Sequence, residues 1–135
     1  MELVIADVHR EPEIDEALNS FTAHGANALL VGSAAFLNSY RSKIVTLATH
    51  YKLPSCFSLR EPVASGGLIS YGSSITDAYR QIGVYAGRVL KGEKVANLPV
   101  MQSSKFELVI NLKTAKLLGL EFHPQLLATA DEVIE

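Results

Sequence analysis

The sequence has 135 residues, of which 48% are hydrophobic, and its 12 basic and 14 acidic side chains give a formal net charge of -2. This composition is too apolar for a disordered protein, and the length fits one domain. No run of basic residues is present, so we expect no binding of nucleic acid.

Nothing in the sequence predicts a membrane-spanning helix. The longest stretch without a charged side chain, residues 21–40, is interrupted by glycine, serine, asparagine and histidine, whereas a span needs about 20 mostly apolar residues. Residues 1–10 lack the basic and apolar regions of a signal peptide. We therefore expect either a cytoplasmic protein, or a periplasmic or lipoprotein-anchored one whose signal belongs to a longer precursor.

The first half of the chain alternates short apolar runs with helical periods. Residues 3–6 (LVIA) predict a first strand, and Pro12 then opens a helix that Gly25 ends. Residues 28–31 (ALLV) predict a second buried strand, and an apolar face at helical spacing predicts the next helix over residues 39–51.

The second half continues the alternation. Strands are predicted over residues 55–58, 68–71 and 107–110, and helices over residues 74–91 and 112–118. Strands that are continuous apolar runs are typical of a parallel sheet covered by helices on both faces. We therefore predict a single α/β domain with a mostly parallel, doubly wound sheet. Ligands of such sheets bind beyond the carboxyl ends of the strands.

The sequence contains no catalytic motif. Cys56 is the only cysteine and is expected to be a small apolar residue of a strand. The four histidines lack the spacing of metal ligands on one helix face. A P-loop, a dinucleotide-binding fingerprint and a nucleophile elbow are all missing. We expect no enzyme, no catalytic residues, no cofactor and no metal.

Six residues near the predicted strand ends are candidates for contact with a ligand, because loops at such positions commonly carry binding groups. The adjacent charges of Arg60 and Glu61 could hold a zwitterion, or form a solvated or structural pair. The rings of Tyr71 and Phe36 could cover a ligand or pack in the core. The candidates are Ser33, Ala34, Phe36, Arg60, Glu61 and Tyr71.

Several segments together resemble one family of ABC-transporter solute-binding proteins, which includes members that bind tryptophan and other amino acids. These segments are residues 59–72 (LREPVASGGLISYG), 77–80 (DAYR), 87–92 (GRVLKG), 105–115 (KFELVINLKTA) and 124–135 (PQLLATADEVIE). They follow the family's order over essentially the whole chain. The resemblance implies a type I periplasmic binding fold, in which two α/β lobes close over a small solute and present it to an ABC permease.

The resemblance also implies that the chain corresponds to the C-terminal portion of such a protein. Residues 1–73 and 99–135 would belong to the second lobe, and residues 74–98 would contain a helix that returns to the first lobe. Without that lobe, the apolar stripe of this helix must fold back onto its own sheet or pack against a second copy of the chain. We therefore expect a homo-oligomer.

We expect the chain to act as a solute-binding component of an ABC importer, or a truncated fragment of one. The small solute would lie at the strand ends. The alternative is a cytoplasmic α/β regulatory or interaction domain that oligomerises through the helix over residues 74–91. A flavodoxin-like enzyme is disfavoured, because residues 7–12 contain no glycine or hydroxyl group for a phosphate-binding turn.

Overall fold

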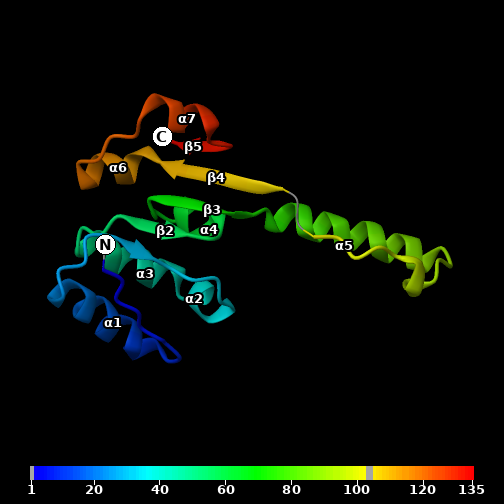
Figure 1. Ribbon diagram of the computed structural model, residues 1–135, viewed down its shortest axis with the longest axis horizontal. Coiled ribbons are helices and arrows are strands. Elements are labelled where there is room, and N and C mark those ends of the chain that lie inside the picture. The colour runs from blue at the N-terminus through cyan, green and yellow to red at the C-terminus, as the bar shows by residue number, and fades with distance from the viewer. Residues whose placement is uncertain (1, 103–104) are drawn as a thin grey trace.

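The computed structural model describes residues 2–102 and 105–135. Met1 and residues 103–104, which fall in the segments expected to form the second lobe, lie outside the described residues. The centre of the molecule is a five-stranded sheet in the order β1-β2-β3-β4-β5 (Figure 1). Its strands are β1 (Leu29–Leu30), β2 (Ser55–Phe57), β3 (Ile69–Ser73), β4 (Phe106–Asn111) and β5 (Glu132–Ile134).

The sheet is mostly parallel. β1 and β2, β2 and β3, and β4 and β5 pair in parallel, whereas β3 and β4 pair antiparallel over five residues. The predicted α/β fold with a mostly parallel sheet is therefore confirmed. Because the direction changes between β3 and β4, the carboxyl ends of β1, β2 and β3 meet the amino end of β4 at one edge of the sheet.

Helices pack around this sheet. α1 (Glu11–Ala23), α3 (Arg41–His50) and α4 (Arg60–Ala64) share a hydrophobic core with β1, β2 and β4. The other helices are α2 (Ala35–Ser39), α5 (Ile75–Leu90), the short 3-10 helix η1 (Val95–Asn97), α6 (Leu112–Leu118) and α7 (Pro124–Thr129). No helix in the described part of the chain is both long and apolar enough to span a membrane.

The core explains why these segments adopt this arrangement. Ile14 and Leu18 project from α1, Ile44 and Val45 from α3, and Val63 from α4, and all five are buried in one cluster. Ile14 and Leu18 lie one turn apart on α1, as do Ile44 and Ala48 on α3, and this spacing lets each helix bury an apolar face against the sheet.

Asn111, the last residue of β4, connects this strand to α6 and α4. Its side chain accepts a hydrogen bond from the backbone N–H of Thr114 (3.1 Å), which caps α6. Its Nδ2 donates to the backbone carbonyl of Val63 (3.0 Å), which holds α4 against the end of β4.

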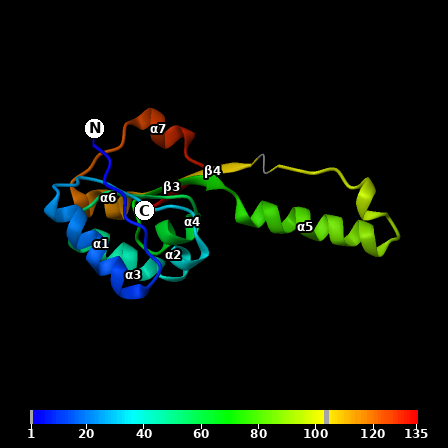
Figure 2. The same ribbon diagram turned by 60° about the horizontal axis from the view of Figure 1, so that its bottom comes forward.

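Helix α5 extends away from the rest of the molecule (Figures 1 and 2). Ser74 caps its first turn, since the Ser74 hydroxyl accepts from the backbone N–H of Asp77 (3.3 Å). None of its residues is buried, and the apolar side chains of Tyr79 and Ile82 are 71% and 61% exposed. Of the two expected arrangements of this helix, folding back onto its own sheet is therefore wrong, whereas packing against a second copy of the chain stays a prediction. Because residues 92–102 return beside it, the Tyr85 hydroxyl donates to the Pro99 carbonyl (2.7 Å).

The structure corrects the sequence-based elements in three places. Residues 3–6 form no strand and Ile5 is 75% exposed, because an apolar run becomes a strand only where a neighbour completes its hydrogen bonds. The helix predicted over residues 39–51 is found as α3, which begins at Arg41 and ends at His50, and α2 precedes it as a separate helix that was not predicted. Residues 60–64, predicted to lie in a loop, form α4.

Candidate functional site

Two depressions lie at the edge of the sheet where β1, β2 and β3 end. Residues 32–34 follow β1, residues 58–59 follow β2, and Ser74 follows β3. α4 begins directly after Leu59 and separates the two depressions, since Leu59 and Pro62 line one of them and Arg60 lines the other. Such a strand-end position is where open α/β sheets bind their ligands.

The first depression, which we call the hollow, lies between the end of β1 and the start of α4. Its volume of about 20 Å³ accommodates about one water-sized group. Side chains of α2, α3 and the strand ends form its wall. The lining residues are Val31, Gly32, Ser33, Ala34, Leu37, Asn38, Arg41, Phe57, Ser58, Leu59 and Pro62.

Two polar side chains of the hollow are incompletely satisfied. The Oδ1 atom of Asn38 and the Nε atom of Arg41 are buried and have no hydrogen-bond partner among the described residues. One other nitrogen of Arg41, Nη1, donates to the backbone carbonyl of Asn38 (3.1 Å). Buried polar atoms in native proteins nearly always find partners, in protein or in water or a ligand. Asn38 and Arg41 thus line the hollow, while the unpaired atoms Oδ1 and Nε themselves are buried away from solvent.

Gly72 lies against the backbone of Ser58, one of the residues that line the hollow. A Cβ atom on this residue would lie 2.0 Å from the backbone carbonyl oxygen of Ser58. β3 can pass Ser58 at this separation only because residue 72 has no side chain. Gly72 therefore sets the position of one wall of the hollow.

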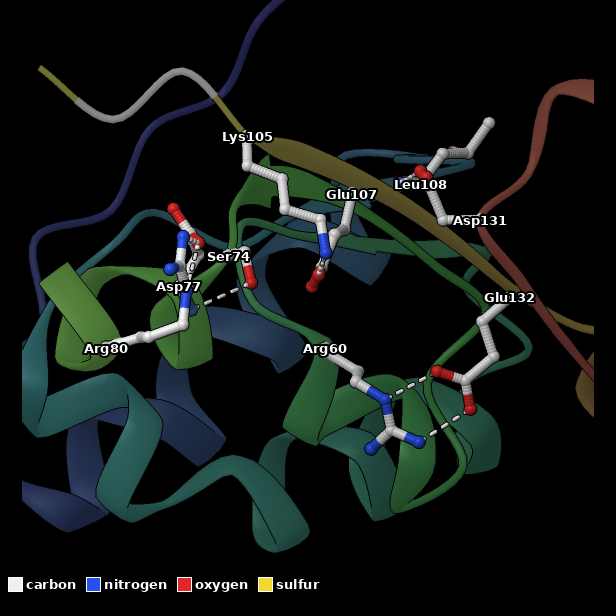
Figure 3. Close-up of polar contacts among 9 residues, drawn as sticks. All are labelled: Arg60, Ser74, Asp77, Arg80, Lys105, Glu107, Leu108, Asp131 and Glu132. Carbon is white, nitrogen blue, oxygen red and sulfur yellow. Dashed lines mark hydrogen bonds and ion pairs between the residues drawn. The ribbon is translucent and has the colours of Figure 1, made fainter.

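The second depression, which we call the groove, is larger, with a volume of about 530 Å³. α4, the start of α5, β4 and the segment leading into β5 contribute its side chains (Figure 3). The lining residues are Arg60, Ser74, Thr76, Asp77, Arg80, Lys105, Glu107, Val109, Asp131 and Glu132.

The charges of the groove are arranged as ion pairs. Arg60 donates to both carboxylate oxygens of Glu132, at 2.5 and 2.6 Å. Arg80 pairs with Asp77 at 2.8 Å, and Lys105 with Glu107 at 3.3 Å.

A fourth carboxylate, that of Asp131, accepts a hydrogen bond from the backbone N–H of Leu108 (2.8 Å). The hydrogen bonds from Arg60 and Arg80 lower the pKa values of Glu132 and Asp77 below their usual range. Both carboxylates therefore stay ionised at neutral pH. The groove carries four carboxylates against three cations, so its formal charge is slightly negative.

The six sequence-based candidates fall in different places. Ser33 and Ala34 line the hollow, and Arg60 lines the groove with its guanidinium on Glu132 rather than beside Glu61. Glu61 is exposed and lines neither depression.

The two aromatic candidates lie outside both depressions. Phe36 packs against the core and its ring lies 5.0 Å from that of Tyr40. Tyr71 is 63% exposed and its ring stacks on Phe106, with 5.9 Å between the ring centroids. The candidates that do line a depression therefore divide between the hollow and the groove.

The residues that sequence reasoning missed are Asn38 and Arg41 in the hollow and the acidic side chains of β4 and β5 in the groove. One signal in the sequence could have identified Arg41. It occupies the first position of α3, and the first turn of that helix contains no acidic residue. A cation there is unfavourable with respect to the helix dipole, so its presence calls for a reason.

Comparison with known proteins gives the family. The sequence matches the family of ABC transporter substrate binding proteins over residues 1–134. The chain belongs to this family. No match was found among curated proteins.

Solved structures agree with this assignment. The chain is similar to the ABC domain in complex with L-Trp from Streptococcus pneumoniae, with 30% identity and a TM-score of 0.82 over 91% of this chain and 41% of that one. It is also similar to a conserved domain protein from Vibrio cholerae, with 21% identity and a TM-score of 0.79 over 90% of this chain and 41% of that one.

A third similar structure is the ligand-free, open form of a substrate binding protein with adhesive properties from Clostridium difficile. Its identity is 22% and its TM-score 0.65, over 95% of this chain and 42% of that one. The chain thus spans about two fifths of the length of each of these structures.

Proposed function

We propose that this chain is a solute-binding component of an ABC importer, or a portion of one, and that it holds a small solute such as an amino acid at the carboxyl ends of β1, β2 and β3. The observation that carries this proposal is the position of the hollow and the groove. Both open at this edge of the sheet, in a chain whose family binds transported substrates. No catalytic role is proposed for any residue.

The size and polarity of the two depressions suit a small zwitterionic solute. The hollow, whose wall is mostly apolar, admits a single small group, and the groove beside it has room for the remainder of an amino acid. The slight excess of carboxylates in the groove favours a cationic group such as an ammonium there. The similar Streptococcus pneumoniae structure is a complex with L-Trp, which supports an amino acid as the solute class.

The proposal includes a first lobe that covers the site. Helix α5 and the segment up to residue 98 leave the sheet immediately beside the groove. We propose that they contact a first lobe, that the two lobes close over the solute, and that an ABC permease receives it. We propose that the protein acts in the periplasm or on a lipid anchor, as part of a longer precursor. Alone, the second lobe provides half of the contacts and should bind weakly.

A thermal-shift screen of the purified chain against amino acids and small organic acids at millimolar concentration tests the proposal. A ligand at about 100 times its dissociation constant stabilises the folded state by about 2.7 kcal/mol. We expect an increase in Tm for one chemical class, and backbone NMR shifts at residues 33–34 and 58–60. A flat screen without such NMR shifts contradicts the proposal.

A second candidate function is supported by the exposed apolar face of α5. A helix with no buried residue and with large exposed apolar side chains is typical of an interaction surface. The chain would then be a cytoplasmic regulatory or interaction domain that forms a homo-oligomer through α5. Size-exclusion chromatography with light scattering tests this candidate. A dimer that binds none of the solutes favours it, and a monomer that binds a solute excludes it.

A further inference from the structure

The sheet has an open edge at β1. The backbone N–H groups of Leu29 and Val31 donate to the carbonyls of residues 54 and 56, at 2.8 and 2.9 Å, so both face β2. Alternate residues of a strand direct their N–H and C=O groups to opposite sides, and those of Leu30 therefore point away from β2. β1 is the first strand in the sheet order, so no strand in the described part of the chain lies on that side. Such an edge is a template for a further strand.

An apolar segment without a partner strand runs past this edge. Residues 3–8 (LVIADV) have the composition of a buried strand but form none in the structure. Leu3 and Ile5 are 70% and 75% exposed, whereas Val8 packs against the core cluster that contains Leu29. Figure 1 shows the segment, in dark blue, on the side of the molecule that holds α1, away from β4 and β5. Among the described residues, the segment and the edge thus both lack the neighbour that would complete their hydrogen bonds.

The face of the sheet next to this edge is apolar and exposed. α1, α3 and α4 bury the opposite face, which carries Leu29 and Phe57. Leu30 lies on the exposed face, in register with Cys56, which is itself in register with Ile69. Leu30 is 74% exposed, and the other two side chains are half-buried. Three neighbouring strands therefore present apolar side chains to solvent on this face.

The strand order indicates which unit would complete the sheet. From residues 3–8 through α1 to β1, and onward to β2 and β3, every crossover runs in one direction and places its helix on one face. A doubly wound sheet of order 2-1-3-4-5 has its first strand between the second and the third. Residues 3–8, β1, β2 and β3 match strands 2, 3, 4 and 5 of this order.

The connection from the first strand to the second runs in the reverse direction along the sheet. Because such crossovers are right-handed, its helix lies on the face opposite to α1. That face is the one on which Leu30 is exposed. The open edge, the unpaired segment and the exposed face are thus explained by one strand and the helix that follows it.

We propose that the space between residues 3–8 and β1 binds a parallel strand, and that the exposed face around Leu30 binds the helix after it. The occupant is a strand–helix segment of the longer precursor that precedes residues 3–8, and on this point the inference rests on the proposed function. Its strand is a run of about five apolar residues, because both of its faces become buried. Its helix is amphipathic, with the apolar stripe on Leu30, Cys56 and Ile69.

The solved structures have room for such a segment. Between 90% and 95% of this chain matches only 41% or 42% of each of them, so more than half of their length lies outside the match. A strand and a helix need only about 30 residues.

The first experiment measures amide hydrogen exchange by NMR in the 135-residue chain and in the same chain with an extension before Met1. The extension consists of about five valine and isoleucine residues, a turn and an amphipathic helix of about 14 residues. We expect the Leu30 amide to exchange without protection in the unextended chain and about tenfold or more slowly in the extended one, because the added strand accepts its hydrogen bond. Leu29, already bonded to residue 54, is the internal control.

Three results would overturn the proposal. The first is an unprotected Leu30 amide in the extended chain. The second is a Leu30 amide that is already protected in a monomeric unextended chain, because residues 3–8 would then fill the edge themselves. The third is protection that appears only when the unextended chain dimerises, which would assign the edge to a second copy. Light scattering on the NMR samples distinguishes the last two.

Two variants of the extended chain make the test specific. Proline at alternate positions of the added strand removes its hydrogen-bond donors and leaves the helix unchanged, so Leu30 should again exchange without protection. Leu30→Lys places a charge beneath the added helix and should abolish most of the increase in Tm that the extension causes. Leu117→Lys, at a 73% exposed position of α6, is the matched control and should keep the increase. Equal effects of the two lysine variants contradict the placement of the helix.

The failure of this inference is separable from the failure of the proposed function. If a solute binds the 135-residue chain while Leu30 stays unprotected in the extended chain, the strand assignment is wrong and solute binding stands. If the extension protects Leu30 and neither chain binds a solute, the strand assignment stands and the proposed function fails.

Discussion

Arg60 and Glu132 join α4 to β5 through two hydrogen bonds, from Nε at 2.5 Å and from Nη2 at 2.6 Å, although 72 residues separate them in the sequence. The pair closes one side of the groove (Figure 3). Its side chains are 46% and 37% exposed, so solvent screens part of the attraction. The pair therefore positions two elements more than it stabilises the fold.

The first prediction follows from this exposure. Replacing Glu132 with Gln should lower the free energy of unfolding by only about 0.5–1 kcal/mol, the value typical of a partly solvated ion pair. Denaturant unfolding of Arg60→Gln, Glu132→Gln and the double variant gives the coupling energy. A coupling above about 3 kcal/mol would instead identify a desolvated pair.

Acid should destabilise the chain because several carboxylates have lowered pKa values. The backbone of His9 and the side chain of Arg10 lower the pKa of Glu13 from 4.5 to about 2. Arg60 lowers the pKa of Glu132, and Arg88 that of Glu93.

A carboxylate whose folded pKa is depressed stabilises the protein above its unfolded pKa. The stability is lost as the pH falls through the folded pKa, here from 4.5 toward about 2 for Glu13. Unfolding measured across this range should show a decrease that is smaller in Glu13→Gln. A stability that rises on acidification would contradict this assignment.

Gly72 should tolerate no side chain. In Gly72→Ala the new Cβ would lie 2.0 Å from the Ser58 carbonyl oxygen, so β3 or the wall of the hollow must move. We expect a cost of about 1–3 kcal/mol in unfolding free energy, as for other overpacked sites. Gly32→Ala is the matched control at the same edge, because its added Cβ meets nothing within 4 Å. Equal effects of both substitutions would show that the clash is relieved without consequence.

Helices and strands that depend on neighbouring residues could be predicted from the sequence. The strands β2, β3 and β4 are short apolar runs, and the helices α5 and α6 begin at capping residues, Ser74 and Asn111. For α6 the predicted range, residues 112–118, equals the observed one. Local hydrogen bonds and side-chain periodicity determine such elements, so neighbouring residues suffice to identify them.

Features that depend on distant partners could not be predicted. Residues 3–6 have the composition of a strand but lack a neighbour in the sheet. From the sequence, Arg60 was expected to act together with the adjacent Glu61. In the fold, the guanidinium of Arg60 instead donates to Glu132 of β5. The hollow is lined by residues that follow β1, residues that follow β2 and the first residue of α3. Their spacing in the sequence does not indicate that these three segments come together in the fold.

The exposed face of α5 should contribute to association rather than to folding. Ile82→Ser removes an apolar side chain that is already solvated, so its unfolding free energy should change by no more than about 0.5 kcal/mol. Sedimentation should show weaker self-association than in the unmodified chain. Ile110→Ala, at a fully buried position, should cost about 2–5 kcal/mol. A large loss of stability in Ile82→Ser would mean that α5 packs against this chain in solution.

Arg41 should lower the free energy of unfolding of the ligand-free chain. Among the described residues, its buried Nε atom has no hydrogen-bond partner and no carboxylate forms an ion pair with its guanidinium, which lies at the start of a helix. Arg41→Met removes both penalties and loses the hydrogen bond to the Asn38 carbonyl. We therefore expect the unfolding free energy to stay within about 1 kcal/mol of the unmodified value, or to rise. Chemical denaturation without added anions measures this. A loss of more than about 2 kcal/mol would assign Arg41 a structural role, because only a satisfied side chain is costly to remove.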